Sequence, residues 1–455
     1  MISPQQFQDR RQRLYDKVQR PVLLCANGHR ARNFPMNRLP FRQDSSFLYY
    51  TGCTEANAAV WIDGSEHHLF LEAAPEGDAL WHGASPSVAE RAQALGFEKM
   101  SNAQDLPHFV QDKNDWLTIA IPDEQVNQWL STQLQQPLQC GVHNGHPDLI
   151  DAIVEQRRIL DETELESMRQ AQKITAESHI SAMAATKAGV NEREIAAAFQ
   201  YPALKAGLEQ AYQPIVTVDG HILHNHHYHN TLQEGQLLLL DGGVESQAGY
   251  ATDVTRTWPV SGQWSTQQRE CYDAVLQAQL RSIALLRSGC RYRDVHTESS
   301  LVIADFLKSV GLLNCSPEAA VESGAHALFF PHGVGHLIGL DVHDLENFGD
   351  CAAYAPGRTR SDQFGTGFLR LDLDLEANMV VTVEPGIYIV PEILNLPEFR
   401  EQFRNEIGWD KLKNWWGFGG IRIEDDARIT NAAPEVLSAA TPKDPDAILK
   451  HIGTA

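Results

Sequence analysis

The sequence predicts an α+β protein with two domains, a smaller N-terminal α/β domain over residues 1–157 and a larger α+β domain over residues 158–455. With 455 residues, the chain is long enough to form two hydrophobic cores. Short apolar runs alternate with polar segments up to residue 157. Beyond it, amphipathic helices and strand-like runs follow one another without strict alternation, which is typical of α+β domains.

Two apolar runs, Pro21–Cys25 and Ala58–Ile62, predict strands in the N-terminal domain. Asp63-Gly64 follows the second run and is typical of a hairpin turn. A helical stretch around Asp148–Arg157 then leads to a new capping residue, so we place the domain boundary near residue 157.

The second domain is expected to contain three amphipathic helices that begin at capping residues. These residues are Asp161 with Glu164 three positions later, Asn191 with Glu194, and Ser265. The third helix is expected to end at Gly289. Between and after the helices, four strand-like segments are predicted: Gln236–Leu240, Tyr250–Trp258, Met379–Val383 and Gly420–Ile423.

The composition argues against several classes of partner. The formal net charge is −22 and no run of Lys or Arg interrupts it, so we expect no nucleic-acid partner. No apolar stretch approaches the ~18 residues needed to span a bilayer, and the N-terminal segment lacks a secretory signal. The seven cysteines include no C-x-x-C pair, as expected for reduced thiols. We therefore predict a cytoplasmic protein without membrane or nucleic-acid partners.

Five side chains of the metal-binding type lie far apart in the chain, each at the end of a strand-like or Gly-flanked run. They are Asp241, Asp253, His336, Glu384 and Glu424. Four carboxylates and one imidazole are too acidic a set for one zinc ion, and they suit two oxygen-preferring divalent ions with bridging carboxylates. Two such ions ~3.5–4 Å apart hold a hydroxide and stabilise both ends of a hydrolytic transition state. The set therefore predicts a hydrolase.

Each segment also has a simpler interpretation. Taken alone, Asp241 in QLLLLDGG is more readily an ordinary residue between a strand and a turn. Asp253 is harder to explain in that way, because an acid inside a β-branched strand needs a partner. Glu384 is followed by Pro385, which ends strand pairing, and Glu424 lies two residues beyond Arg422 on the same strand face.

The segment PHGVGHLIGLDVHD contains His332, His336 and His343. Its glycines and proline argue against a helical zinc site, and the Glu of H-E-x-x-H is missing. We expect a Gly-rich loop with one histidine as ligand and the others facing substrate. The tract HILHNHHYHN equally fits a surface loop or an adventitious metal binder, and only its His224 is assigned a role.

Together, LLLLDGG…YATDVTRTWPVSG, FFPHGVGHLIGLDVHD, VVTVEPGIY and GGIRIEDD resemble the dinuclear peptidases of the pita-bread fold. This group includes methionine aminopeptidase, aminopeptidase P and prolidase. FRQDSSFLYYTGCTEANA and ALWHG in the first domain are similar to the N-terminal domain of the last two. The resemblance covers nearly the whole chain and implies a pita-bread catalytic domain behind a smaller α/β domain.

The resemblance also implies roles for the site residues. Asp253 and Glu424 would bridge two ions, Asp241 would complete the shell of one, and His336 with Glu384 that of the other. Glu384 would also accept a proton from the attacking water. The remaining assignments are substrate and oxyanion contacts for His224 and His343, supporting or substrate-binding roles for His332 and Arg422, and, for Trp81, a contact with the partner's active site in a homodimer. Ligand type favours Mn²⁺, with Co²⁺ or Zn²⁺ as alternatives.

Arg370 decides between two substrate classes. It lies fourteen residues before Glu384 and resembles the prolidase arginine that binds the free carboxylate of a dipeptide. A surface arginine in a polar insertion is the alternative. The long segment 344–369 is also similar to prolidase. We therefore predict a manganese-dependent Xaa-Pro dipeptidase; the alternatives are an Xaa-Pro aminopeptidase acting on longer peptides and, less readily, a non-catalytic binding protein.

Two departures from the family pattern affect this prediction. Asp241 and Asp253 are twelve residues apart, one more than is usual in the family, and we expect the extra residue in the turn at Ser246–Ala248. If it shifted the register instead, Asp253 would face away from the site. The loop TVDGH before His224 is shorter than in the family, so Tyr212 is assigned no role.

Overall fold

The computed structural model describes residues 2–64 and 66–454. It divides into two compact units. Unit 1 comprises Met1–Arg158 together with Leu345–Ala352, and unit 2 comprises Ile159–Asp344 and Ala353–Ala455. The assignment of segment 345–352 to the N-terminal unit is a feature that no local signal in the sequence predicted.

Unit 1 is built on a four-stranded sheet in the order β1-β2-β3-β4. The first three strands pair antiparallel, and the fourth joins β3 in parallel. The strands are β1 (Val22–Cys25), β2 (Ala59–Asp63), β3 (Glu66–Leu71) and β4 (Lys99–Asn102). The helices are α1 (Pro4–Val18), α2 (Ser45–Thr51), α3 (Ala79–His82), α4 (Val88–Ala94), η1 (Ala103–Asp105), α5 (Leu106–Gln111), α6 (Glu124–Leu134), α7 (Pro147–Arg157) and η3 (Glu346–Phe348).

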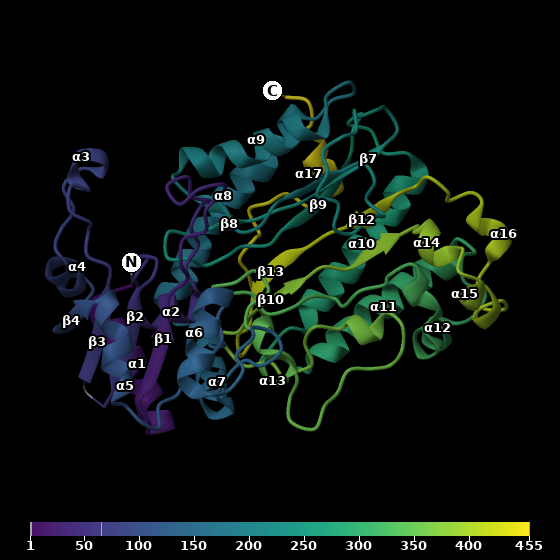
Figure 1. The fold of residues 1–455 in the computed structure, drawn as a ribbon. Helices are drawn as coiled ribbons and strands as arrows, with labels where there is room; N and C mark the ends of the chain where they lie inside the picture. Colours follow the sequence, from purple (N-terminus) through teal and green to yellow (C-terminus); the bar gives the residue numbers. More distant parts are fainter. Residues whose placement is uncertain (1, 65, 455) are drawn as a thin grey trace. The chain divides into compact units, whose positions relative to one another are not determined.

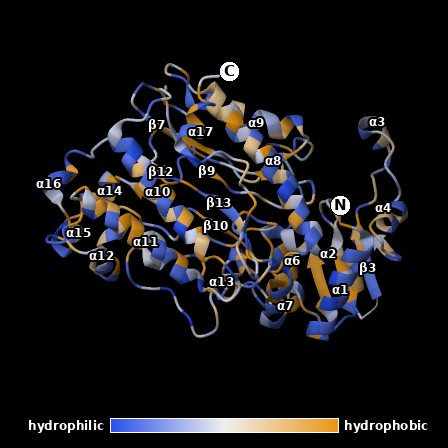
Figure 2. Ribbon diagram, turned by 180° about the vertical axis from the view of Figure 1, so that it is seen from behind, coloured by the Kyte–Doolittle hydropathy of each residue, from blue (hydrophilic) through white to orange (hydrophobic). Residues whose placement is uncertain are grey.

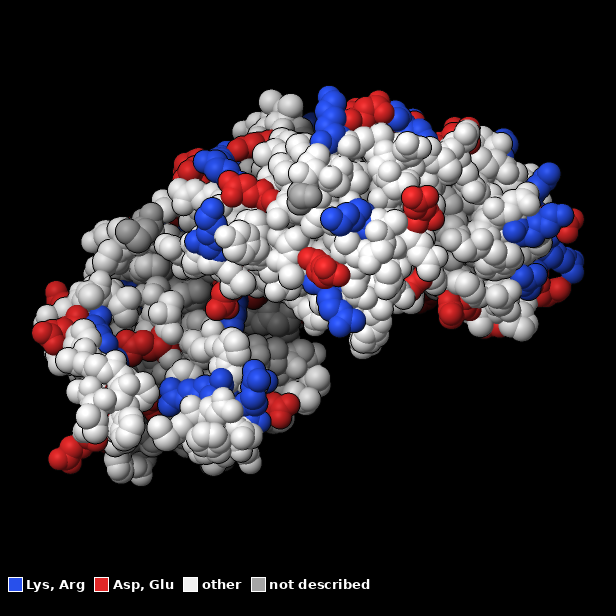
Figure 3. Space-filling view, turned by 90° about the horizontal axis from the view of Figure 1, so that it is seen from above, with Lys and Arg blue, Asp and Glu red and all other residues white. Residues whose placement is uncertain are grey.

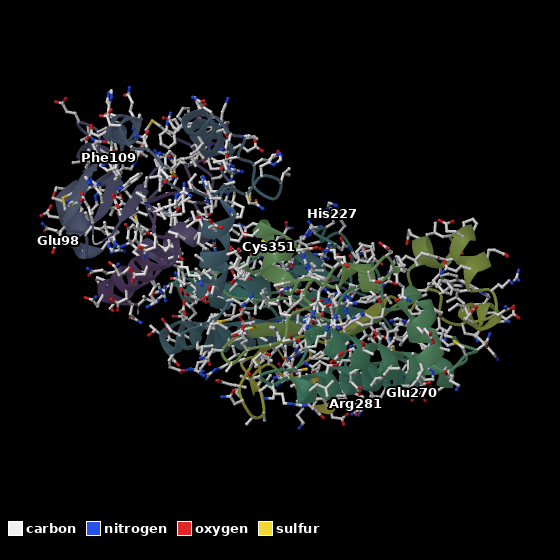
Figure 4. The ribbon with its side chains drawn as sticks, turned by 90° about the horizontal axis from the view of Figure 1, so that it is seen from below. Glu98, Phe109, His227, Glu270, Arg281 and Cys351 are labelled. Carbon is white, nitrogen blue, oxygen red and sulfur yellow. The ribbon has the colours of Figure 1, made fainter. Side chains whose placement is uncertain are left out.

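Aromatic residues fill part of the unit 1 core. The ring of Phe109, which is labelled in Figure 4, lies 5.4 Å from that of Trp61 and 5.0 Å from that of Phe70. Both contacts are edge-to-face, the favoured arrangement for aromatic pairs. The apolar strands predicted at residues 21–25 and 58–62 therefore form a buried sheet of their own.

Unit 2 contains short sheets and long helices. Its strands are β5 (Glu209–Gln210), β6 (Ile215–Thr217), β7 (Leu237–Asp241), β8 (Val244–Glu245), β9 (Thr255–Pro259), β10 (Val380–Val383), β11 (Gly386–Tyr388), β12 (Gly420–Arg422), β13 (Asp425–Arg428) and β14 (Glu435–Val436). Its helices are α8 (Glu162–Ala185), α9 (Glu192–Lys205), α10 (Thr266–Leu285), α11 (Tyr292–Ser309), α12 (Pro317–Ser323), η2 (Ala325–Leu328), η4 (Thr366–Phe368), α14 (Pro391–Leu394), α15 (Pro397–Gln402), α16 (Trp409–Leu412) and α17 (Pro445–Leu449). The short helix α13 (Asp350–Ala353) crosses from one unit to the other.

The strands of unit 2 lie between the helix pair α8–α9 and the helix pair α10–α11 (Figure 1). Two neighbouring residues of β13 show this arrangement, because successive side chains of a strand point to opposite faces. Asp426 accepts a hydrogen bond from Gln172 of α8, whereas Asp425 accepts one from Gln279 of α10. Figure 2 shows hydrophilic and hydrophobic stretches mixed along α8 and α9, as expected for helices that cover a sheet.

The predicted helix starts are confirmed. Asp161, Asn191 and Ser265 are N-caps, and each forms a capping box with the residue three positions later. Helix α10 ends at Leu285, before the predicted end at Gly289, because Leu286 adopts an extended backbone conformation. Among the described residues, no helix has the length and apolar character that crossing a membrane requires.

The predicted strand Tyr250–Trp258 is partly wrong. Only Thr255–Pro259 is a strand, so Asp253 lies just before β9 and not within it. The chain at Thr252 approaches the backbone of Gly243 so closely that a Cβ there would meet the Thr252 carbonyl at 1.7 Å. This close approach replaces regular pairing with isolated hydrogen bonds, such as that from Gly242 N to Val254 O.

Charged side chains are interspersed over the face of the molecule shown in Figure 3. Among the described residues visible there, basic and acidic groups alternate and form no broad basic surface. The expectation, from the net charge, that nucleic acid is not a partner stays a prediction.

Candidate active site

Asp241 and Asp253 meet at the end of β7. Asp241 is the last residue of that strand and pairs with Thr255, two residues after Asp253. Both carboxylates are buried, and the Tyr212 hydroxyl lies within hydrogen-bond distance of both, at 2.5 Å from Asp241 Oδ1. The residues between the strands close a turn through the hydrogen bonds Ser246 N to Tyr250 O and Gly249 N to Ser246 O. The extra residue does not separate the two aspartates.

Glu424 joins this pair from the bend between β12 and β13. Oxygen atoms of Asp241, Asp253 and Glu424 lie within 4.8 Å of one another. The hydroxyl of Thr255, at the start of β9, donates to Glu424 Oε2 at 2.6 Å and orients this carboxylate. Glu424 is 2% exposed. Three acidic groups therefore share one buried position.

His336 approaches from the Gly-rich loop, and Glu384 from the residue that follows β10. His336 Nε2 lies 3.5 Å from Asp253 Oδ2 and 3.7 Å from Glu384 Oε1. Glu384 directly follows β10, and its backbone N–H donates to Val334 O at 2.8 Å. Atoms of His336, Glu384 and Glu424 again lie within 4.8 Å. The structure thus brings all five predicted metal-binding side chains together; we call their four carboxylates the carboxylate cluster.

The orientation of His336 is set by its own segment. Nδ1 lies 2.9 Å from Leu337 O, so Nδ1 carries the proton and Nε2 has its lone pair toward the carboxylates. The backbone N–H of His336 donates to Thr382 Oγ1 at 3.1 Å. A Cβ at Gly335 would lie 2.4 Å from Thr382 O, so only glycine allows this approach.

His343 and Arg370 lie next to His336. The rings of His336 and His343 are 4.5 Å apart, and Asp253, His336 and His343 form a third group within 4.8 Å. Arg370 Nη1 lies 2.9 Å from His343 Nε2 and Nη2 lies 3.0 Å from Nδ1. Burial, followed by the charges of His336 and Arg370, lowers the pKa of His343. Its ring is therefore neutral at neutral pH.

His332, Arg422 and Tyr388 form the adjoining wall of the site. Tyr388 OH lies 2.8 Å from His332 Nε2 and accepts from Arg422 Nη1 at 3.1 Å. Arg422 also binds Asp241 Oδ2 at 2.6 Å, and His332 Nδ1 lies 3.8 Å from Glu384 Oε2. Arg422 thus neutralises part of the cluster's charge and orients the Tyr388 hydroxyl.

Two predicted residues lie outside the close contacts. His224 is exposed, and its pKa is lowered by partial burial and then by the positive charge of Arg422. Charges on Asp241 and Arg370 also act on it, which places it beside the site and not within the ligand groups. Trp81 belongs to unit 1 and is 75% exposed on α3. Its predicted contact with a partner subunit stays a prediction.

His227, at the surface in Figure 4, stacks on His229 with ring centroids 5.2 Å apart.

The carboxylate cluster has unusual acid–base properties. Burial and the charges of neighbouring carboxylates raise the pKa of Asp253 and of Glu424 well above the ordinary values. Burial raises the pKa of Glu384 to about 7, although His336 and Arg422 oppose it. Buried, mutually repelling carboxylates of this kind are stabilised by bound cations. The donor set therefore fits a pair of divalent ions that prefer oxygen ligands.

A second layer of polar residues holds the ligand segments, and the sequence prediction missed it. Asp426 Oδ2 accepts from the Asp253 backbone N–H at 2.9 Å and from the Gln172 amide. Thr175, one helical turn after Gln172 in α8, hydrogen-bonds Thr252 at 2.7 Å. Gln172 and Thr175 are buried on α8, and the sequence prediction assigned them no role.

Tyr212 is the other residue that the sequence prediction left out. Its hydroxyl contacts both aspartates, although the shortened TVDGH loop had put its position in doubt. The only local signal is its place just before β6, which pairs with β7 so that Ile215 lies opposite Asp241. Pairing of that kind is set over long range, so the sequence alone did not identify the contact.

Comparisons with known proteins agree with this geometry. Residues 166–431 match the family described as Metallopeptidase family M24, and residues 7–115 match Aminopeptidase P, N-terminal domain. A protein of Podospora anserina named "Probable Xaa-Pro aminopeptidase" is 33% identical over 429 residues, covering 91% of this chain and 88% of that protein. One of Talaromyces marneffei with the same name is 32% identical over 421 residues, covering 90% and 87%.

Solved structures give the same result. Zinc-substituted Escherichia coli aminopeptidase P in complex with product has a TM-score of 0.81 at 27% identity, covering 99% of this chain and 98% of that one. The Pseudomonas aeruginosa aminopeptidase PepP has a TM-score of 0.82 at 26% identity with the same coverage. The predicted fold, a pita-bread domain with a smaller N-terminal domain, is confirmed.

Proposed function

Because the chain belongs to metallopeptidase family M24, we propose that it is a metal-dependent Xaa-Pro aminopeptidase, which releases the N-terminal residue of peptides with proline second. The observation that carries the proposal is the meeting of five ligand-type side chains in overlapping groups within 4.8 Å. The names of the relatives favour this activity over the dipeptidase that the sequence predicted.

Two divalent ions would be held by the carboxylate cluster and His336. The residues that would hold them are Asp241, Asp253, His336, Glu384 and Glu424, through carboxylate oxygens and the imidazole Nε2. Four carboxylates favour Mn²⁺ or Co²⁺ over Zn²⁺. When bound, such ions make a water nucleophilic at neutral pH and polarise the scissile carbonyl.

The chain's own residues would supply the proton transfers and the positioning. Glu384 accepts a proton from the attacking water and passes it to the prolyl nitrogen as the bond breaks. His343 and His224 contact the substrate on the side where the oxyanion develops. Arg422 and Tyr388 keep His332 and Asp241 in place, as their hydrogen bonds indicate.

Proline explains why such a site is needed. Its ring removes the backbone N–H and fixes φ, so peptidases that pair with the substrate backbone act poorly on this bond. A site that acts directly on the carbonyl does not require that donor.

A second candidate, an Xaa-Pro dipeptidase, is favoured by one observation. Arg370 lies beside His343, which itself belongs to a ligand group with Asp253 and His336. A guanidinium there is suited to the carboxylate of a C-terminal proline, because its donors bind a carboxylate bidentately. All five ligand-type residues are present, which disfavours the non-catalytic alternative. Hydrolysis of organophosphate esters is a side reaction that the same chemistry would allow.

Comparing Ala-Pro-Ala with Ala-Pro tests the proposal. We expect the manganese-loaded protein to hydrolyse Ala-Pro-Ala with the higher kcat/KM and to lose the activity in chelator. A preference for Ala-Pro would establish the dipeptidase instead, and hydrolysis of neither peptide would reject both. The homodimer, with Trp81 at the partner's site, and the cytoplasmic location are proposed with the same function; sedimentation of wild type and Trp81→Ala tests the dimer.

A further inference from the structure

A buried carboxylate, Asp372, lies in the segment that precedes Glu384 and contacts three arginines. Its side chain is fully buried. Arg291 makes a bidentate pair with it, with Nε and Nη2 each 2.7 Å from a carboxylate oxygen. Arg293 Nη2 lies 2.9 Å from Oδ2, and Arg358 Nη1 donates to the backbone carbonyl of Asp372 at 3.0 Å. Arg291 and Arg293 flank the start of α11, so this helix anchors the segment.

The Asp372 carboxyl remains ionised in this environment. Burial acts to raise its pKa, but the hydrogen bond from Arg291 and the charges of Arg293 and Arg358 outweigh burial and hold the pKa below its usual range. Bidentate arginine pairs are among the strongest hydrogen-bonded contacts in proteins. Asp372 is therefore a fixed point in the chain.

A second fixed point lies three residues earlier, at Leu369. Its carbonyl accepts from Tyr354 OH at 2.6 Å and from Arg360 Nη1 at 3.0 Å. A Cβ at Gly333 would lie 2.9 Å from the Leu369 Cα, so the backbone there touches the loop that carries His332 and His336. The segment thus lies directly against the histidine loop of the site.

Arg370 lies between these two fixed points. Its guanidinium contacts His343, and the side chains of Leu371 and Leu373 on either side of Asp372 are buried. An arginine side chain is long and loses much conformational freedom when it is ordered, so a rigid backbone mount reduces the cost of binding a ligand through it.

We propose that Asp372 is a positioning residue that holds Arg370 at the site and thereby sets how strongly the enzyme prefers a free carboxylate on the proline residue. This inference deepens the proposed function and rests on it, because the position of Arg370 would determine how well dipeptides bind relative to longer peptides. A firmly held Arg370 adds affinity for a C-terminal proline in an enzyme that still acts on longer peptides, whereas a displaced Arg370 loses this added affinity.

Binding of proline and of prolinamide to the metal-loaded protein tests the inference without any hydrolysis. The two ligands differ in the carboxylate alone. We expect wild type to bind proline about 10-fold more tightly than prolinamide, the factor that one retained charged contact gives. Asp372→Asn is expected to lose this difference, as Arg370→Ala does, and to bind prolinamide as wild type does.

Asp374→Asn is the matched control. Asp374 is two residues away, is 57% exposed, and pairs with Arg358 through two hydrogen bonds of 2.8 and 2.9 Å. The variant Asp374→Asn should retain the wild-type preference for proline over prolinamide. Arg293→Gln, which removes one partner of Asp372, should lose part of the preference and serves if Asp372→Asn does not fold.

Kinetics of Ala-Pro give a second readout. In Asp372→Asn, KM for Ala-Pro is expected to rise about 10-fold with kcat nearly unchanged, and KM for Ala-Pro-Ala should not rise. An unchanged proline preference in Asp372→Asn, a preference lost equally in Asp374→Asn, or none in wild type would overturn the inference. Absence of hydrolysis with the expected binding pattern would reject the proposed function alone.

Discussion

A single buried carboxylate, Asp425, lies next to the carboxylate cluster in unit 2 and is stabilised in the opposite way. Asp425 accepts hydrogen bonds from Arg256 at 2.8 Å and from Gln279 at 2.5 Å, and Lys443 also binds it; we call Asp425 with these three donors the Asp425 cluster. Glu424, the preceding residue, receives a hydroxyl hydrogen bond from Thr255 and faces other carboxylates. Both side chains are buried.

The pKa values of these neighbours move in opposite directions. Burial acts to raise the pKa of Asp425, but Arg256 and Lys443 outweigh it, so the pKa lies well below the usual range. Burial and the charges of Asp253 and Glu384 raise the pKa of Glu424 well above its usual range. Burial is common to both, so the nearby charges determine the outcome. A fully paired acid stabilises the fold, whereas a group of acids that repel one another and share one arginine is suited to cations.

The largest expected effect comes from Asp253→Asn. Because Asp253 belongs to two of the three ligand groups, its loss should lower kcat/KM on the order of 10⁴-fold, about 5 kcal/mol of activation free energy. Metal content measured after gel filtration should fall in parallel. The metal-free variant should be no less stable than metal-free wild type, since a repelling charge has been removed. A variant with full metal content and activity would contradict the proposed role.

Asp425→Asn, unlike Asp253→Asn, is expected to lower the stability of the metal-free protein. Removing one charge from a buried ion pair leaves the guanidinium of Arg256 without its partner, and we expect a loss of about 3–5 kcal/mol in the free energy of unfolding. Urea denaturation of metal-free protein measures this directly. Asp273→Asn, which removes a half-exposed partner of Arg269, is the control and should cost less than about 1 kcal/mol. Equal losses of unfolding free energy in Asp425→Asn and Asp273→Asn would show that the ion pair of Asp425 has no special stabilising role.

Local signals predicted the helix starts and the individual ligands, because caps and strand ends depend on residues close in sequence. The capping boxes at Asp161 and Asn191 were found in this way. The five ligand-type residues were also picked out by such signals; the structure brings them together, and their role as ligands stays a prediction. Tyr212, Asp426 and Asp372 were missed. Each acts through contacts with residues that are distant in the sequence, such as Gln172 with Asp426, and an acid in a strand gives no sign of which cation or donor it will meet.

The smallest effect expected is a pH dependence that separates the two clusters without mutation. In metal-free protein the pKa of Glu384 is raised to about 7 from its usual 4.5, so the folded state binds one more proton than the unfolded state between these values. The contribution to stability is fully present below pH 4.5 and is lost as the pH rises through about 7, at about 1.4 kcal/mol per pH unit. Asp253 and Glu424 act in the same direction.

Asp425 adds no pH dependence of stability between pH 4.5 and about 7. Its pKa is lowered in the folded state, so its stabilising effect is lost only when the pH falls below its usual pKa of 3.8. Manganese-loaded protein should behave in the opposite way to metal-free protein, since ions compete with protons for the same oxygens and bind more tightly as the pH rises. Urea unfolding at pH 5, 6 and 7, with chelator and with Mn²⁺, should therefore give two stability curves that diverge with pH. Parallel curves would mean that the carboxylate cluster does not bind the ions, and the comparison with Asp425 would lose its basis.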